Sequence, residues 1–284
     1  MNIKLRLEQP EDYRIVEELT REAFWGLDSP GCVEHLLVHK LRTIPAFVPD
    51  LDYVAEFDGK IIGNVMYAKA KIIDDTGKQY EVLEFSPLSV LPEYQNQGVG
   101  KALLKHTIEE AKRLGYRAIL FFGEPDYYPR LGFQRAGVFN IATAWGANFD
   151  AFMAMPLYDD ALNGISGRFY LDPVYDVDAE EAAEFDNTFP YKEKHILAPI
   201  NILLENLTPP AKEAFGENKI TLLAELRKYS GREIVSWHGI DRDAMFIINT
   251  TLKDHGYPPK IWPERTESNS ASFGVREGSS ACST

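Results

Sequence analysis

The chain has 284 residues, 45% hydrophobic and 26% charged, a composition typical of globular proteins with one large or two ordinary domains. Its formal net charge of −13 opposes non-specific nucleic-acid binding, which needs a basic surface. Cys32 and Cys282 lie too far apart to indicate a disulfide framework. We expect a cytoplasmic protein, because the chain shows neither a signal-peptide pattern nor a run of about 18 apolar residues.

The first 150 residues alternate between strand and helix patterns, which predicts an α/β unit. Residues 3–8 alternate in the manner of a strand, and residues 10–24 have helical spacing with an acidic first turn. Asp58-Gly59 is a hairpin turn signal between two strands. In chain order, the pattern predicts a strand over 3–8, helices over 10–24 and 32–42, two strands within 52–74, a strand over 80–90, a helix over 100–115 and a strand over 116–123.

The character of the chain changes twice after residue 150. Alternating and apolar runs continue to about residue 175, so residues 1–175 are expected to form one α/β domain. Residues 176–197 form an acidic connector, and residues 198–262 show short helical patterns separated by turn residues, which predicts a small all-helical domain. The polar, small-residue tail at 263–284 is expected to be disordered.

The junction between the strand over 80–90 and the following helix predicts an anion site. A glycine-rich turn into a helix offers unpaired N–H groups and the positive end of the helix dipole, where phosphate is the usual guest. The dinucleotide pattern fails at Leu103, and the P-loop pattern fails at Gln95 and Ala102. The pattern that fits is Gln-x-x-Gly-x-Gly, formed by Gln95, Gly98 and Gly100.

This junction resembles the acetyl-CoA pyrophosphate loop of GNAT (GCN5-related) N-acetyltransferases. The family's Tyr-x-x-x-Gly-Phe signature is matched after the next strand by Tyr128, Gly132 and Phe133. The wider pattern over 31–42, 83–104, 123–133 and 184–195 is similar to the YhbS-like group. The resemblance implies a GNAT acyl-CoA-binding fold with a mixed, splayed sheet, acetyl-CoA as co-substrate and no metal. It places the co-substrate on Leu88, Ser89, Val90, Gln95, Asn96, Gln97, Gly98, Val99, Gly100 and Lys101.

Acyl transfer from a thioester needs an oxyanion stabiliser and an acid for the departing thiolate. The resemblance implies that the backbone N–H of Val90 stabilises the thioester oxygen, a role that Pro92 cannot fill because proline has no N–H. The position-matched acid is Tyr128. Its neighbour Tyr127 is an alternative, and either ring could instead simply pack under the Gly-Phe turn.

The amine acceptor also needs a base, and Glu84 is the candidate. It interrupts an otherwise apolar strand eleven residues before Gln95, the offset at which histone-type GNAT enzymes carry their basic glutamate. Desolvation there would raise the pKa of the carboxyl toward a useful value. The alternatives are a glutamate that faces solvent or an ion pair, and a water chain anchored by Glu56 or Glu124.

Candidate acceptor contacts lie near the second predicted helix. That helix corresponds to the substrate side of GNAT folds, so the resemblance implies that Trp25, His35 and His39 line the acceptor pocket, with Glu124 and Asp126 at its entrance. An acidic entrance suits an amine, although solvation alone explains such residues equally well. His35 and His39 have the i, i+4 spacing of metal ligands, but no third ligand is evident and we expect no metal.

The helical segment 198–262 resembles the C-terminal domain of the RNA polymerase α subunit, with its helix-hairpin-helix-like core. DNA-binding versions present a Gly-x-Gly hairpin to phosphate, whereas this chain has Gly239-Ile240-Asp241. Aspartate repels phosphate, and the segment has balanced charge. A protein-contact or structural role is therefore favoured over DNA binding.

The leading hypothesis is an N-acetyltransferase that moves the acetyl group of acetyl-CoA to an amine of a small molecule or peptide by direct attack in a ternary complex. The alternative is a non-catalytic acyl-CoA sensor or adaptor whose helical domain docks a protein partner. A longer acyl chain is also compatible with the loop, which contacts only the CoA pyrophosphate. The sequence leaves the oligomeric state open, a homodimer included.

Overall fold

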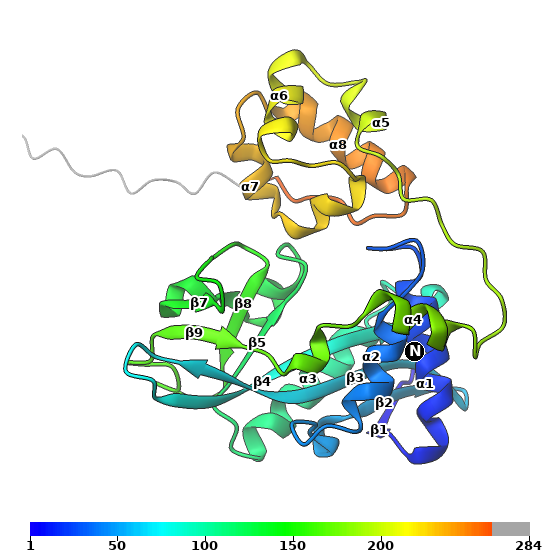
Figure 1. Ribbon diagram of the computed structural model, residues 1–284, viewed down its shortest axis with the longest axis vertical. Helices are drawn as coiled ribbons and strands as arrows, with labels where there is room; N and C mark the ends of the chain where they lie inside the picture. The colour runs from blue at the N-terminus through cyan, green and yellow to red at the C-terminus, as the bar shows by residue number, and fades with distance from the viewer. Residues whose placement is uncertain (263–284) are drawn as a thin grey trace, which may run out of the picture.

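The computed structural model describes residues 1–262, and the tail predicted at 263–284 lies outside the described residues. A mixed sheet with flanking helices forms the first part of the chain, and a group of short helices lies across one end of it (Figure 1). The predicted α/β fold with a helical C-terminal part is confirmed. Among the described residues, no helix is both long and apolar enough to cross a membrane.

In the described part of the chain the sheet has nine strands in the order β1-β2-β3-β4-β5-β8-β6, and β9 pairs with β3 and β7. Pairing is antiparallel except between β4 and β5 and between β7 and β9, so the sheet is mixed. Its strands are β1 (Lys4–Leu7), β2 (Tyr53–Phe57), β3 (Lys60–Ile73), β4 (Gln79–Val90), β5 (Ala118–Phe122), β6 (Gln134–Arg135), β7 (Ile141–Thr143), β8 (Phe152–Pro156) and β9 (Gly167–Tyr170).

The hairpin between β2 and β3 forms at the predicted turn. Asp58 and Gly59 both have positive φ, 49° and 76°, as the two central residues of a tight hairpin with right-handed twist require. Further along, Ser86 and Pro87 of β4 lie opposite the single residue Met66 of β3, which makes a bulge.

Three helices cover the two faces of the sheet. Helix α3 (Val99–Arg113) packs closely on one face, where a Cβ at Gly63 would lie 3.0 Å from Val99. Helices α1 (Tyr13–Phe24) and α2 (Glu34–Leu41) cover the opposite face. There the Thr20 hydroxyl of α1 is 2.9 Å from the Ser89 hydroxyl of β4. The sheet is thus buried on both sides, which explains why most of β3 and β4 is apolar.

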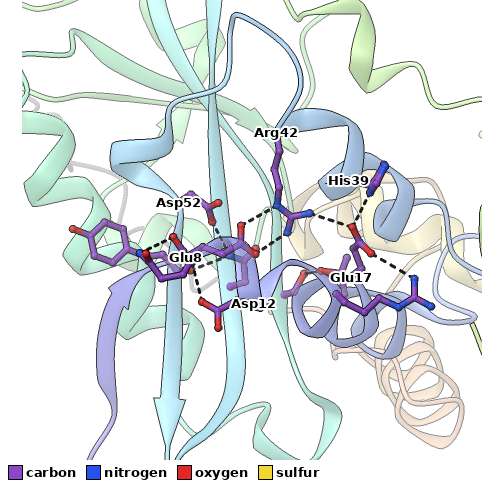
Figure 2. A network of polar contacts seen from close by, with 12 residues as sticks. Glu8, Asp12, Glu17, His39, Arg42 and Asp52 are labelled. Carbon is purple, nitrogen blue, oxygen red and sulfur yellow. Dashed lines mark hydrogen bonds and ion pairs between the residues drawn. The ribbon is translucent and has the colours of Figure 1, made fainter.

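A buried network of charges joins β1, α1 and α2 (Figure 2). Arg42 donates to Glu8 at 2.7 Å and to Glu17 at 3.3 Å, and its side chain is only 6% exposed. His39 Nδ1 lies 2.8 Å from Glu17. Burial and the adjacent Glu8 raise the pKa of Asp52 well above its ordinary value. Arg42 therefore neutralises Glu8, which would otherwise be buried without a cation, and shares Glu17 with His39.

The acidic connector is docked onto the α/β part. Helix α4 (Ala179–Asp186) begins at Asp178, whose side chain caps two backbone N–H groups. Its last residue accepts from Arg21 Nε of α1 at 2.5 Å, and Glu181 pairs with Lys40 of α2 at 2.7 Å. The acidic residues of this segment thus meet basic residues of α1 and α2.

The helical part has its own apolar core, which includes the fully buried Phe215, Leu226 and Ile248. Asp241 caps its last helix by accepting from the N–H of Ala244 at 2.8 Å. The helices are α5 (Asn201–Leu204), α6 (Pro209–Glu217), α7 (Gly231–Ser236) and α8 (Arg242–Asp254), with a 3₁₀ helix at Leu223–Lys228.

Polar contacts hold the helical part against the loop after β5. Lys260 Nζ, fully buried, lies 2.6 Å from Glu124 Oε1. Asp126 accepts backbone hydrogen bonds from Gly231 at 3.1 Å and Ile261 at 3.2 Å. Two further contacts join Ser230 to Asp150 and Arg227 to Asp28.

Candidate active site

No side chain of residues 1–262 caps the N-terminus of α3. Its N-cap residue is Gly98, with φ 89°, and the first turn contains no acidic residue. The backbone N–H of Ala102 donates to Gly98, so the N–H groups of Val99, Gly100 and Lys101 precede the first helical hydrogen bond. Unbonded N–H groups and the positive end of the helix dipole together favour an anion at this position.

The side chains of the preceding loop hold its own backbone. Gln95 donates to the carbonyl of Val90 at 3.0 Å, and Gln97 donates to the carbonyl of Glu93 at 2.7 Å. Asn96 has a positive φ of 58°. The two glutamines therefore shape the loop, and the groups left for a ligand are mainly its backbone N–H groups.

Strands β4 and β5 diverge beside this loop. They pair only at Leu83 and Ile119, and β4 continues to Val90 without β5. The N–H of Leu91 donates to β3, and successive N–H groups of a strand alternate in direction, so the N–H of Val90 points toward the gap. The predicted splay is confirmed. Leu88 and Val90 line the resulting cleft, whereas Ser89 is buried on the opposite face of the sheet.

A cleft of about 770 Å³ lies between this gap, the α3 N-terminus and the helical part. Its charged lining residues are Lys101, Arg130, Arg227 and Lys253, and no carboxylate of residues 1–262 lines it. It is therefore a cationic cleft in an acidic protein. The remaining lining residues are Ala23, Phe24, Leu27, Leu88, Val90, Tyr94, Gln95, Asn96, Gly98, Val99, Gly100, Tyr127, Gly256, Tyr257, Pro258 and Pro259.

The two adjacent tyrosines differ in their surroundings. Tyr128 packs against Phe121 at a centroid distance of 4.5 Å and against Phe85 and Phe133. Burial raises the pKa of its phenol, so the group keeps its proton at neutral pH. Tyr127 is one of the residues that line the cleft, whereas Tyr128 is not. Both can donate a proton, and only Tyr127 lines the cleft directly.

Glu84 lies on the sheet face that α1 and α2 cover and does not line the cleft. It is 3% exposed, and burial raises the pKa of its carboxyl to about 8. Tyr175 interacts with it and favours its charged form, but the two make no hydrogen bond of ordinary geometry. Glu84 thus has a pKa suited to a base and a position that is closed to solvent.

The predicted acceptor residues do not meet in one pocket. Trp25 is buried and donates to the carbonyl of Glu193 at 2.9 Å. His35 is fully buried between Phe185 and Phe189, and burial lowers its pKa to about 4. Neither residue lines the cleft, and Glu124, bonded to Lys260, does not line it either. Within residues 1–262, no group of three or more His, Cys, Asp or Glu side chains is placed to hold a metal.

Sequence reasoning missed several residues that line the cleft. Phe24 and Leu27 come from the end of α1 and the loop after it, and Arg130 follows the two tyrosines. Arg227 and Lys253 come from the helical part. Their charge could have drawn attention, but no local pattern connects segments so far apart in the chain.

Comparison with known proteins agrees with this geometry. A family model of the acetyltransferase (GNAT) domain matches residues 51–135. The uncharacterized N-acetyltransferase YhbS of Escherichia coli K12 is 32% identical over 164 residues, which cover 57% of this chain and 92% of that protein. The uncharacterized N-acetyltransferase YjhQ of the same organism is 33% identical over 86 residues, 30% of this chain and 47% of that protein.

Among solved structures, YhbS from Escherichia coli in complex with CoA superposes with a TM-score of 0.55 and 28% identity, over 62% of this chain and 93% of that one. The YhbS similarity extends over nearly the whole length of the relative, in sequence and in structure. The resemblance to GNAT proteins is thereby confirmed. The chain belongs to the GNAT family of N-acetyltransferases.

Proposed function

We propose that this protein transfers the acetyl group of acetyl-CoA to an amine of a small molecule or peptide by direct attack in a ternary complex. The observation that carries the proposal is the uncapped N-terminus of α3, which lies in the cleft beside the gap between β4 and β5. The N–H groups of Val99, Gly100 and Lys101 suit the pyrophosphate of CoA. The YhbS structure, which contains CoA, supports the same donor.

The pantetheine arm would run along Leu88 and Val90 into the gap. With the thioester there, the Val90 N–H is the group that faces its oxygen. The amine nitrogen attacks the carbonyl carbon, the C–S bond breaks, and the departing thiolate takes a proton. We assign that proton to Tyr128 by its position in the family signature, with Tyr127 as the alternative because it lines the cleft.

Glu84 is the proposed base for the amine. Its pKa of about 8 places its proton affinity between those of a free carboxyl and an alkyl amine. Because its carboxyl is buried beside Tyr175, it would act through an intervening group rather than by direct contact with the acceptor.

The donor site is tested by calorimetric titration of the protein with acetyl-CoA, with Gly98→Asp and Gly98→Asn as a matched pair. Asparagine and aspartate have the same shape, and both tolerate a positive φ better than most residues. Only aspartate adds a negative charge at the helix N-terminus. We expect wild type to bind, and Gly98→Asp to bind on the order of ten- to a hundredfold more weakly than Gly98→Asn.

Failure of wild type to bind acetyl-CoA would overturn the proposal. If acetyl-CoA binds, a panel of small and peptide amines is then assayed for release of the CoA thiol. Binding without turnover of any amine would instead support a non-catalytic acyl-CoA-binding protein.

A further inference from the structure

One wall of the cationic cleft comes from the helical part. Arg227 lies in its 3₁₀ helix, Lys253 near the end of α8, and the segment 256–259 directly after that helix. These residues line the same cavity as Gly98 and Lys101 of the α3 junction. In Figure 1 the helical group lies beside the α/β part of the chain.

The charge of this cleft differs from that of the protein. The chain carries 43 acidic and 30 basic residues, yet four cations and no carboxylate of residues 1–262 line the cavity. Two of the four belong to the helical part, whose overall charge is balanced. A local excess of this kind marks a place where anions are held.

The cations of the helical wall are available for a ligand. Lys253 is exposed, and no carboxylate of the described residues lies within ion-pair distance of it. Arg227 does meet Asp28, but both contacts, at 2.8 and 2.9 Å, use Nη1. The Nε and Nη2 donors of this guanidinium make no hydrogen bond within residues 1–262. A guanidinium with two free donors can still bind a phosphate.

The wall is also held in place. The buried ion pair of Lys260 with Glu124 and the two backbone hydrogen bonds to Asp126 fix the helical part against the loop after β5. A buried ion pair with its surrounding hydrogen bonds is costly to break. Arg227 and Lys253 therefore face the cleft from a docked surface.

We infer that the helical part is the second half of the acyl-donor site and that Lys253 and Arg227 bind phosphate groups of the CoA moiety. CoA carries a pyrophosphate and a 3′-phosphate, and the α3 N-terminus can neutralise only part of that charge. The inference rests on the proposed function, because it takes acetyl-CoA as the ligand. The helical part would then bind the donor, whereas docking a separate protein would not require cations in this cleft.

The test is calorimetric titration of the full chain with CoA and with dephospho-CoA, which lacks the 3′-phosphate. Lys253→Ala is compared with Lys212→Ala, which removes an exposed lysine of the same helical part outside the cleft. Arg227→Gln is compared with Asp28→Asn, which breaks the same ion pair and keeps the cation. We expect Lys253→Ala and Arg227→Gln each to weaken CoA binding roughly three- to tenfold, with both controls near wild type.

The two ligands locate the contact. A loss that persists with dephospho-CoA places the cations on the pyrophosphate, and a loss confined to CoA places them on the 3′-phosphate, and either result supports the inference. If wild type binds CoA while Lys253→Ala matches Lys212→Ala and Arg227→Gln matches Asp28→Asn, the inference is wrong and the donor site stands. If wild type binds no CoA, the proposed function fails first.

Discussion

The cleft and the α1–α2 face of the sheet use polar groups in opposite ways. On the α1–α2 face, buried charges meet partners: Arg42 lies between Glu8 and Glu17, and Arg21 pairs with Asp186. In the cleft, backbone N–H groups precede the first hydrogen bond of α3, and Lys253 has no ion-pair partner within residues 1–262. Buried charges that meet partners stabilise the fold, whereas groups that line an open cleft without partners are available to a ligand.

This difference explains why several residues predicted for the site lie outside the cleft. Glu84 stands out in the sequence as a carboxylate in an apolar strand, whereas His35 and Trp25 follow from the resemblance to GNAT folds, and all three are buried on the α1–α2 side. A polar residue in an apolar pattern indicates burial, and only the surrounding structure decides whether it also contacts substrate.

The largest effect is expected from the tyrosine pair beside the cleft. If Tyr128 protonates the thiolate, Tyr128→Phe should lower kcat by about 10²–10⁴ while leaving acetyl-CoA affinity nearly unchanged. Tyr127→Phe is the matched control, because it removes the hydroxyl of the neighbouring ring. The measurement is turnover with an amine found in the screen. A large loss in Tyr127→Phe and none in Tyr128→Phe would assign the proton to the residue that lines the cleft.

On the opposite face, Arg42→Met should destabilise the protein by about 3–5 kcal/mol, because it leaves Glu8 buried without a cation and removes one of the partners of Glu17. Denaturant unfolding measures the loss. Lys60→Met, which breaks an exposed ion pair with Glu93, serves as the control and should change stability little. The affinity of folded Arg42→Met for CoA should equal that of wild type. A parallel loss of affinity would show that the α1–α2 face also contributes to ligand binding.

Glu84→Gln separates a structural from a catalytic carboxyl. The pKa of Glu84 is about 8 in the folded protein, against 4.5 ordinarily, so wild type loses stability as pH rises from about 4.5 to 8. Glutamine does not ionise. The stability of the variant relative to wild type should therefore increase by on the order of 3–5 kcal/mol between pH 4 and pH 9.

Unfolding at several pH values checks this shift, and turnover measured alongside it identifies the role. Loss of turnover in Glu84→Gln, together with loss of a rise in rate near pH 8, would support the base. Unchanged turnover with the expected stability shift would make Glu84 purely structural.

The smallest effect is expected at His35. Its folded-state pKa of about 4 lies below the ordinary 6.5, so wild type loses stability as pH falls from about 6.5 to 4. His35→Phe keeps an aromatic ring between Phe185 and Phe189 and removes the titrating group. The decrease in the free energy of unfolding on acidification should therefore be smaller in the variant by roughly 2–3 kcal/mol. Thermal unfolding between pH 7 and pH 4 measures it, and an unchanged acid loss would show that His35 is not the group responsible.

Local patterns predicted the parts of this fold that local physics determines. The Asp58-Gly59 hairpin, the glycine junction at α3 and the apolar runs of β3 and β4 follow from residues that are adjacent in the chain. These were sufficient for the α/β class and for the glycine junction at the start of α3, and the family resemblance supplied the GNAT fold. The family resemblance, rather than periodicity, supplied the expectation of a splay between β4 and β5.

What the sequence did not predict depends on contacts between distant segments. Whether Glu84 is solvent-facing or enclosed depends on Tyr175, ninety-one positions later in the chain. Glu124 was expected at an acceptor entrance, and its partner Lys260 comes from the helical part. Arg227 and Lys253 carry no motif at all. Long-range packing, and not local preference, brings these groups together.

The cationic cleft has a consequence for the speed of ligand capture. A charge of −13 repels an approaching polyanion at long range, whereas the four cations attract it at short range. Added salt screens the long-range field first, since the Debye length is about 8 Å at physiological ionic strength. Moderate salt should therefore accelerate encounter with CoA and also hasten its escape, so that both rate constants rise together while the equilibrium changes less than either.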